Sequence, residues 1–195
     1  MLATLRHTLL FAVLPFTVLG SLSKRATPSS WELYAYGTGH GGLSVFYSDG
    51  LAYAGDPTLA NGSDVAEVVT FSVGADNMWI GNPNTTFSNS TDTPDWANVT
   101  LYVPGPSDDN MQLGFLNSND TISNTTKTSG FSFYGQTAMY IEEDGTVETL
   151  FTALKLDSGV LQLYWNDTSS GQTPVTLRRT APSNPTNRRA PPNRR

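Results

Sequence analysis

The sequence contains no cysteine. This excludes a disulfide framework, a thiolate metal site and a cysteine nucleophile, so burial of apolar surface alone must stabilise the folded chain. Histidine is almost as scarce, because His40 is the only one after residue 7. A transition-metal centre or a Ser-His-Asp triad would have to use it. We therefore expect no metal, no cofactor and no assignable catalytic residue.

Basic residues are nearly missing from the main part of the chain. Between residues 26 and 177, Lys127 and Lys155 stand against all 17 acidic residues, a net charge of −15. Such a segment repels phosphate backbones, which argues against nucleic-acid binding. The end of the chain reverses the sign, with arginines among prolines and asparagines. We expect residues 181–195 to form a disordered basic tail.

Long hydrophobic runs are also absent. The longest, Leu9 to Leu19, follows Arg6 and is too short to span a bilayer. This order is typical of a secretory signal peptide, expected over residues 1–20. A propeptide over residues 21–25 would end at the dibasic processing site Lys24-Arg25. The sequence thus predicts secretion to the medium or cell wall, with no membrane attachment after signal removal.

Asn-x-Ser/Thr acceptors are abundant and lie mostly between hydrophobic runs, where exposed loops are expected. The seven acceptor asparagines are Asn61, Asn84, Asn89, Asn98, Asn119, Asn124 and Asn166. They predict a glycoprotein.

From residue 31 onward, short runs of aromatic and β-branched residues alternate with Gly, Asn, Asp, Pro and Ser, which predicts strands and turns. Asp49-Gly50, Asp144-Gly145 and Asp157-Ser158-Gly159 are typical of hairpin turns. The expected strands are 31–36, 43–47, 51–54, 65–73, 78–81, 99–103, 111–116, 131–134, 138–142, 147–156, 160–165 and 175–177.

We therefore predict one all-β domain over residues 26–180, with about twelve short strands. A weak internal echo links Thr70–Gly81 with Thr100–Gly114. Repeated hairpins of this size fit a β-trefoil-like barrel, and a two-sheet β-sandwich fits nearly as well.

Two residues are candidates for ligand binding. His40 lies in the glycine-rich segment Gly37–Gly42, a loop that could admit a ligand, or simply a turn. Trp96 is flanked by loop residues and could offer a flat face to a sugar, or fold back onto the core. Trp79 and Trp165 lie in apolar strand runs and are expected in the core.

Two glutamates, Glu67 and Glu148, lie inside expected strands. Glycoside hydrolysis needs only two suitably separated carboxylates, so these could serve a glycosidase, or could be outward members of alternating strands. The acidic turns Asp108–Asn110 and Glu142–Asp144 lack the spacing of a calcium loop.

Several features resemble small secreted proteins of filamentous fungi that associate with the cell wall, of the PhiA type. The resemblance rests on the signal segment, Lys24-Arg25, the hairpins after Val68, and the opening Tyr36-Gly37-Thr38-Gly39 followed by Leu43-Ser44-Val45-Phe46. It implies association with the wall and carries over no catalytic residue. The cysteine-free composition departs from that family.

The sequence therefore favours a secreted, non-enzymatic glycoprotein of the cell wall or extracellular matrix. The first alternative is a carbohydrate-binding, lectin-like module, and the second is a glycoside hydrolase that uses strand glutamates. The expected partners are cell-wall or host glycans.

Overall fold

The computed structural model describes residues 29–87, 92–121 and 123–183. The expected signal peptide and propeptide, with Lys24-Arg25, lie outside these residues, as do Asn89 and the tail after residue 183. The strands are β1 (Trp31–Glu32), β2 (Tyr34–Gly37), β3 (His40–Ser48), β4 (Leu51–Ala54), β5 (Glu67–Val73), β6 (Trp79–Pro83), β7 (Val99–Tyr102), β8 (Gly114–Leu116), β9 (Phe131–Tyr134), β10 (Thr137–Ile141), β11 (Val147–Glu148), β12 (Phe151–Lys155), β13 (Leu161–Trp165) and β14 (Thr173–Arg178).

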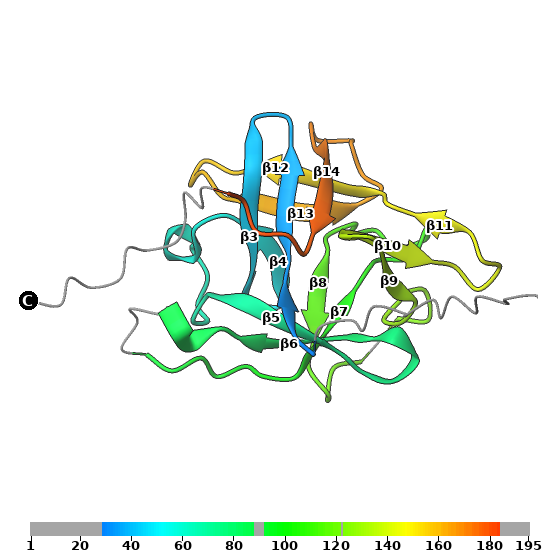
Figure 1. Ribbon diagram of the computed structural model, residues 1–195, viewed down its shortest axis with the longest axis horizontal. Coiled ribbons are helices and arrows are strands. Elements are labelled where there is room, and N and C mark those ends of the chain that lie inside the picture. Colours follow the sequence, from blue (N-terminus) through cyan, green and yellow to red (C-terminus); the bar gives the residue numbers. More distant parts are fainter. Residues whose placement is uncertain (1–28, 88–91, 122, 184–195) are drawn as a thin grey trace, which may run out of the picture.

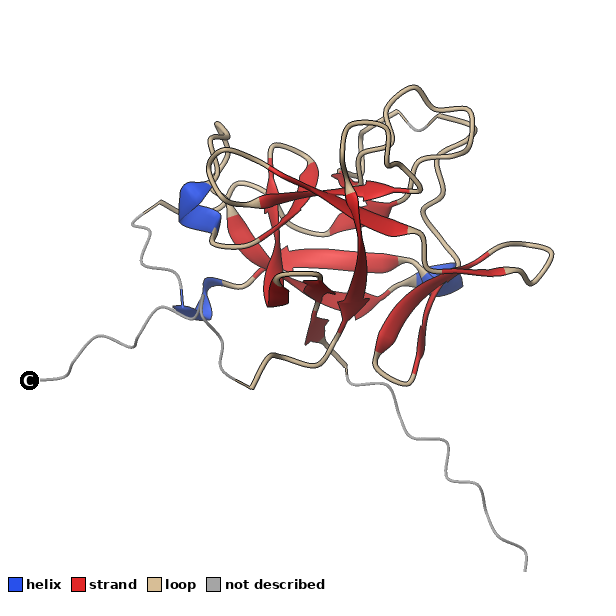
Figure 2. Ribbon diagram, turned by 90° about the horizontal axis from the view of Figure 1, so that it is seen from above, coloured by secondary structure: helices blue, strands red, loops and turns tan. Residues whose placement is uncertain are grey.

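The described residues form three short 3-10 turns, η1 (Pro57–Leu59), η2 (Ala75–Asn77) and η3 (Thr85–Phe87), and otherwise strands and loops (Figure 2). The all-β prediction is confirmed. Among the described residues, no helix has the length and apolar character needed to cross a membrane.

The antiparallel strands close into a barrel. The circuit of ten strands runs β2-β14-β12-β13-β4-β8-β7-β6-β5-β3 and returns to β2. The β3–β4 hairpin bridges this circuit. In Figure 1 it stands upright, with β12 and β13 across its upper end and β5 and β6 across its lower end. Closure leaves few free sheet edges and favours the predicted barrel over two separate sheets.

Each of the twelve expected segments overlaps at least one strand, but two of them divide. In the segment 31–36, β1 pairs with β5, whereas β2 pairs with β3 and β14. In the segment 147–156, β11 pairs with β10, whereas β12 pairs with β13 and β14. Both breaks occur where the chain changes pairing partners, which a local hydrophobic pattern does not record.

A continuous series of aromatic rings runs through the single core. Adjacent centroids lie 4.2 to 6.2 Å apart, within the range of favourable ring contacts for all but the closest pair. In spatial order the rings are Trp96, Tyr47, Phe115, Phe71, Trp79, Phe131, Tyr140, Trp165 and Phe151. The core assignment of Trp79 and Trp165 is confirmed.

All three predicted hairpin turns are present. Asp49 and Gly50 both have positive φ values, 47° and 77°, as a tight two-residue turn requires. The Asp49 carboxylate also accepts hydrogen bonds from the backbone N–H groups of Ser63 (2.9 Å) and Asp64 (2.8 Å). These bonds fasten the segment before β5 to the β3–β4 turn.

The Asp49 contacts predict loss of stability in acid. Hydrogen bonds from the N–H groups of Asp64 and Ser63 hold the pKa of Asp49 below its ordinary value of 3.8. A carboxyl whose pKa is lowered by folding stabilises the native state fully above its unfolded pKa, and this stabilisation disappears as pH falls through the folded pKa. The melting temperature should therefore fall between about pH 5 and about pH 3.

The matched variant is Asp49→Asn, which suits the positive φ but carries no charge. Thermal unfolding across this pH range should show that the melting temperature of the variant depends less steeply on pH. Some slope should persist, because hydrogen bonds also lower the pKa values of Asp108, Asp144 and Asp167. Glu148, whose pKa is raised by burial and by Glu142, acts in the opposite sense. Identical slopes for the two proteins would contradict the assignment to Asp49.

Candidate functional site

A groove of about 540 Å³ lies where distant parts of the chain meet. We call it the Arg179 groove. It is lined by Ser30, Trp31, Glu32, Tyr34, Thr70, Asn84, Thr86, Gln136, Arg179 and Ala181. Its volume falls within the range typical of small-molecule sites. Its lining combines a tryptophan and a tyrosine with a carboxylate, two amides and a guanidinium.

Arg179 is held in place by the β9–β10 turn. Its Nε donates to Oε1 of Gln136 (2.8 Å) and its Nη2 to the carbonyl of Gly135 (3.0 Å). The guanidinium carbon lies 4.7 Å from the ring centroid of Phe133, a cation–π distance. Nη1 of Arg179 and Nε2 of Gln136 take part in none of these bonds. The groove therefore presents donors from two side chains that are already oriented.

Glu32 organises a second wall of the groove. Its Oε2 accepts from the hydroxyl of Tyr34 (2.5 Å) and its Oε1 from Nδ2 of Asn84 (2.7 Å). Bonds to an ionised acceptor are stronger than those between neutral groups. Glu32 thus fixes the positions of two neighbouring polar groups.

Aromatic side chains complete the site. Trp31 is 7% exposed, and its ring makes an edge contact with Trp79 at 5.5 Å. The buried Nε1 of Trp31 has no hydrogen-bond partner among the described residues. Tyr134 is 82% exposed and directly precedes the Gly135-Gln136 turn. Tyr134 is not among the residues that line the groove.

Trp96 is not the exposed sugar platform that one interpretation expected. It is 4% exposed, and its ring stacks on Tyr47 with centroids 4.2 Å apart. Its Nε1 donates to the carbonyl of Val65 (2.9 Å). The alternative, in which the loop folds Trp96 back onto the core, is correct. The indole buries apolar area and satisfies its N–H at the same time.

His40 is the first residue of β3 and pairs with Gly37 across the Thr38-Gly39 turn. It is half-buried and lines neither of the two cavities described for residues 29–87, 92–121 and 123–183. A Cβ at Gly42 would lie 2.6 Å from the Tyr36 ring, and the residue has φ 97°. Glycine is thus required there by a packed tyrosine and by the backbone. The segment forms a tight turn between paired strands, which is the alternative to an open loop.

The two strand glutamates are not brought together. Glu67 is buried in β5 opposite Tyr47 of β3. Glu148 instead lines a second cavity of about 160 Å³ with Glu142 and Lys127, whose Nζ lies 3.8 Å from Oε2 of Glu142. Burial, followed by the charges of Glu142 and Asp144, raises the pKa of Glu148. This cavity is about half the lower limit of ordinary ligand sites, roughly 300 Å³.

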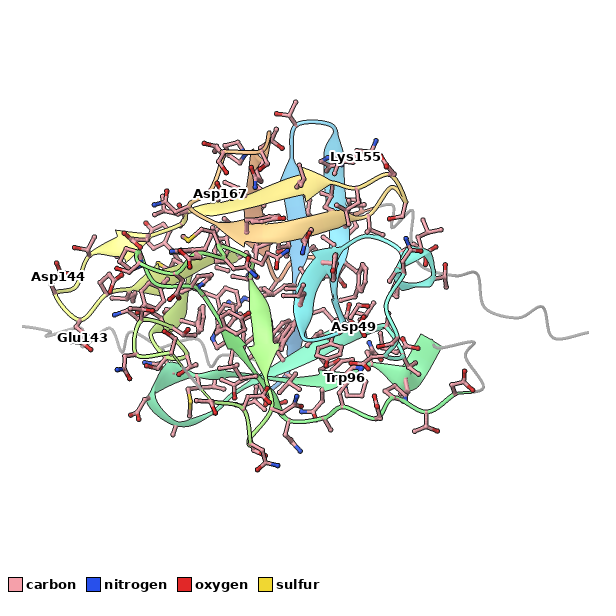
Figure 3. All side chains as sticks on the ribbon, turned by 180° about the vertical axis from the view of Figure 1, so that it is seen from behind. Asp49, Trp96, Glu143, Asp144, Lys155 and Asp167 are labelled. Carbon is pink, nitrogen blue, oxygen red and sulfur yellow. The ribbon has the colours of Figure 1, made fainter. Side chains whose placement is uncertain are left out.

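The carboxylates of the acidic turns accept hydrogen bonds from backbone N–H groups within the same turns. Oδ2 of Asp108 accepts from the N–H of Gly105 (2.7 Å), and Oδ1 of Asp144 accepts from the N–H of Thr146 (2.8 Å). In Figure 3, Asp144 and Glu143 project from the β10–β11 turn on the side opposite Asp49 and Trp96. Among the residues described, no group of three or more His, Cys, Asp or Glu side chains is placed to hold a metal ion.

The described acceptor asparagines fall into two classes. Five are exposed, namely Asn61, Asn98, Asn119, Asn124 and Asn166. Asn84 is half-buried and lines the Arg179 groove. The sequence did not distinguish Asn84 from the exposed acceptors, because the acceptor motif carries no information on burial.

Sequence reasoning also missed Glu32, Gln136 and Arg179 as groove residues. Arg179 lay within the predicted domain, directly after the alternating pattern of β14, but nothing in that pattern marked it as a site residue. Its backbone N–H donates to the carbonyl of Gln136 (3.0 Å), which extends the sheet by one bond.

No protein-family model matches this chain, and comparisons with curated proteins and with solved structures find no match. Function is therefore inferred from the geometry of the groove.

Proposed function

We propose that this chain is a secreted, non-enzymatic glycoprotein of the cell wall or extracellular matrix, and that it binds carbohydrate in the Arg179 groove. The observation that carries the proposal is the convergence of Glu32, Asn84, Gln136 and Arg179 beside Trp31. Planar polar side chains that are fixed by hydrogen bonds can recognise the closely spaced hydroxyls of a sugar, and an aromatic side chain can contact its apolar face.

Wall or host glycans fit the charge pattern of the chain better than polyanions do. The strongly acidic body repels phosphate-rich partners, whereas Arg179 and Gln136 supply donors to neutral or carboxylate-bearing sugars. Glycoside hydrolysis has less support, since Glu67 and Glu148 are apart and the cavity at Glu148 is small.

Arg179→Ala should weaken carbohydrate binding by about ten-fold to a hundred-fold, because a bond to a charged group contributes about 1.5–3 kcal/mol. The measurement is a glycan array with the secreted protein, followed by calorimetric titration with the best oligosaccharide. The matched control is Arg178→Ala. Arg178 is the preceding residue, is exposed, and lies over the Tyr36 ring outside the groove lining.

The control should change affinity less than about two-fold. Equal losses in the two variants would indicate a nonspecific effect of charge and contradict the groove as the site. Absence of binding to any glycan would overturn the proposal, and turnover of a glycoside panel by the wild-type protein would overturn its non-enzymatic part. Near-ultraviolet circular dichroism establishes that both variants are folded.

A further inference from the structure

Asn84 is distinguished by where its amide nitrogen lies. Nδ2 donates to Oε1 of Glu32 (2.7 Å) and Oδ1 accepts from the N–H of Thr86 (3.1 Å). Thr86, the hydroxyl-bearing residue of the same acceptor motif, also lines the groove. At exposed acceptors such as Asn119 and Asn124, by contrast, the side chain faces solvent.

This placement determines where a glycan on Asn84 would begin. In N-glycosylation, Nδ2 bonds to the anomeric carbon of a diphosphate-activated glycan, the diphosphate leaves, and the amide loses one of its two hydrogens as a proton. The remaining N–H can still donate to Glu32. Because Nδ2 belongs to the groove wall, the first sugar attached to it starts inside the groove.

The groove also offers such a sugar unused donors. Nη1 of Arg179 and Nε2 of Gln136 lie outside the bonds that hold these side chains. A sugar presents several oxygen acceptors, and a groove of about 540 Å³ has room for a ligand of small-molecule size.

We infer that glycosylation of Asn84 regulates the Arg179 groove. A glycan attached to Asn84 occupies the groove and excludes external carbohydrate. When Asn84 is unmodified, the groove is open. This inference rests on the proposed function. It adds that the competing occupant is part of the same molecule, so the fraction of Asn84 that is modified sets the fraction of molecules able to bind.

The test compares the secreted wild-type protein with Thr86→Val, which removes the Asn84 acceptor motif and keeps Asn84. The matched control is Thr121→Val, which removes the exposed Asn119 motif. Glycopeptide mass spectrometry gives the occupancy of each site. Chito-oligosaccharide and β-glucan oligosaccharide serve as probes, and endoglycosidase digestion of the native proteins measures the access to each glycan.

We expect the native wild-type protein to lose its Asn84 glycan at least about ten-fold more slowly than the glycans on its exposed, occupied sites. Thr86→Val should bind probe at least about ten-fold more tightly than wild-type protein that is modified at Asn84, and Thr121→Val should bind like wild type. An unmodified Asn84, equal digestion rates, or equal probe affinities would each overturn the inference.

The two proposals fail differently. If no form of the protein binds either probe or any arrayed glycan, the proposed function fails, whereas slow digestion confined to Asn84 would still support a glycan seated in the groove. If Thr86→Val and modified wild type bind equally well, the proposed function survives and the regulation by Asn84 is wrong.

Discussion

Trp96→Ala is expected to lower the free energy of unfolding by about 3–5 kcal/mol. The indole is almost fully buried, it stacks on Tyr47, and its N–H is bonded to the carbonyl of Val65. Truncation opens a cavity at one end of the aromatic series and leaves the half-buried Val65 carbonyl without this donor. Since whole domains are stable by only about 5–15 kcal/mol, the loss is large. Chemical denaturation should show a lower midpoint at an unchanged slope.

Trp96→Phe separates the two contributions. It keeps a ring against Tyr47 but loses the hydrogen bond to Val65, so its cost should be about 1–3 kcal/mol. An alanine variant as stable as wild type would contradict the buried position. Weak glycan binding by an unfolded Trp96→Ala protein would say nothing about a sugar site, so this variant reports on stability.

Trp79→Ala is expected to be comparably damaging, at about 3–5 kcal/mol. Trp79 is 2% exposed and contacts Phe71, Phe131 and Phe133 as well as Trp31. Because Trp31 lines the Arg179 groove, a Trp79→Ala protein that still folds at low temperature should also bind carbohydrate more weakly. Thermal unfolding and calorimetric titration measure the two effects.

The control for Trp79 is its cross-strand partner. Val73 pairs with Trp79 in the β5–β6 ladder but is 51% exposed. Val73→Ala should therefore change stability by no more than about 0.5 kcal/mol. Similar losses for the two variants would mean that pairing in the ladder, and not burial of the indole, determines the cost.

Much of the local structure is predictable because it depends on neighbours in sequence. The alternation of Leu51–Ala54 and of Phe131–Tyr134 predicts the bounds of β4 and β9 as the structure has them. Asp49-Gly50 predicts its turn, because few residues adopt consecutive positive φ values at low cost. Where a strand changes partners, as at Leu33 between β1 and β2, the same pattern predicts one strand in place of two.

Burial in loops is less predictable, as Trp96 and Asn84 illustrate. The residues around Trp96 are polar and suggest exposure, yet Tyr47 of β3 covers the indole. The motif at Asn84 is the same as at Asn119, yet Glu32 of β1 binds the amide. In both cases the deciding contact comes from a residue far away in the chain.

By itself, the sequence determined that the body is all-β, cysteine-free and strongly acidic, and it determined the positions of strands, hairpin turns and acceptor asparagines. These properties depend on composition and on intervals of a few residues. Only the tertiary structure decided that the sheet closes into a barrel and that Glu32, Gln136 and Arg179 share a groove. Closure joins β2 to β14, which lie at opposite ends of the body, and the groove forms where these ends meet the β9–β10 turn. Such contacts depend on the register of long-range strand pairing, which local patterns do not specify.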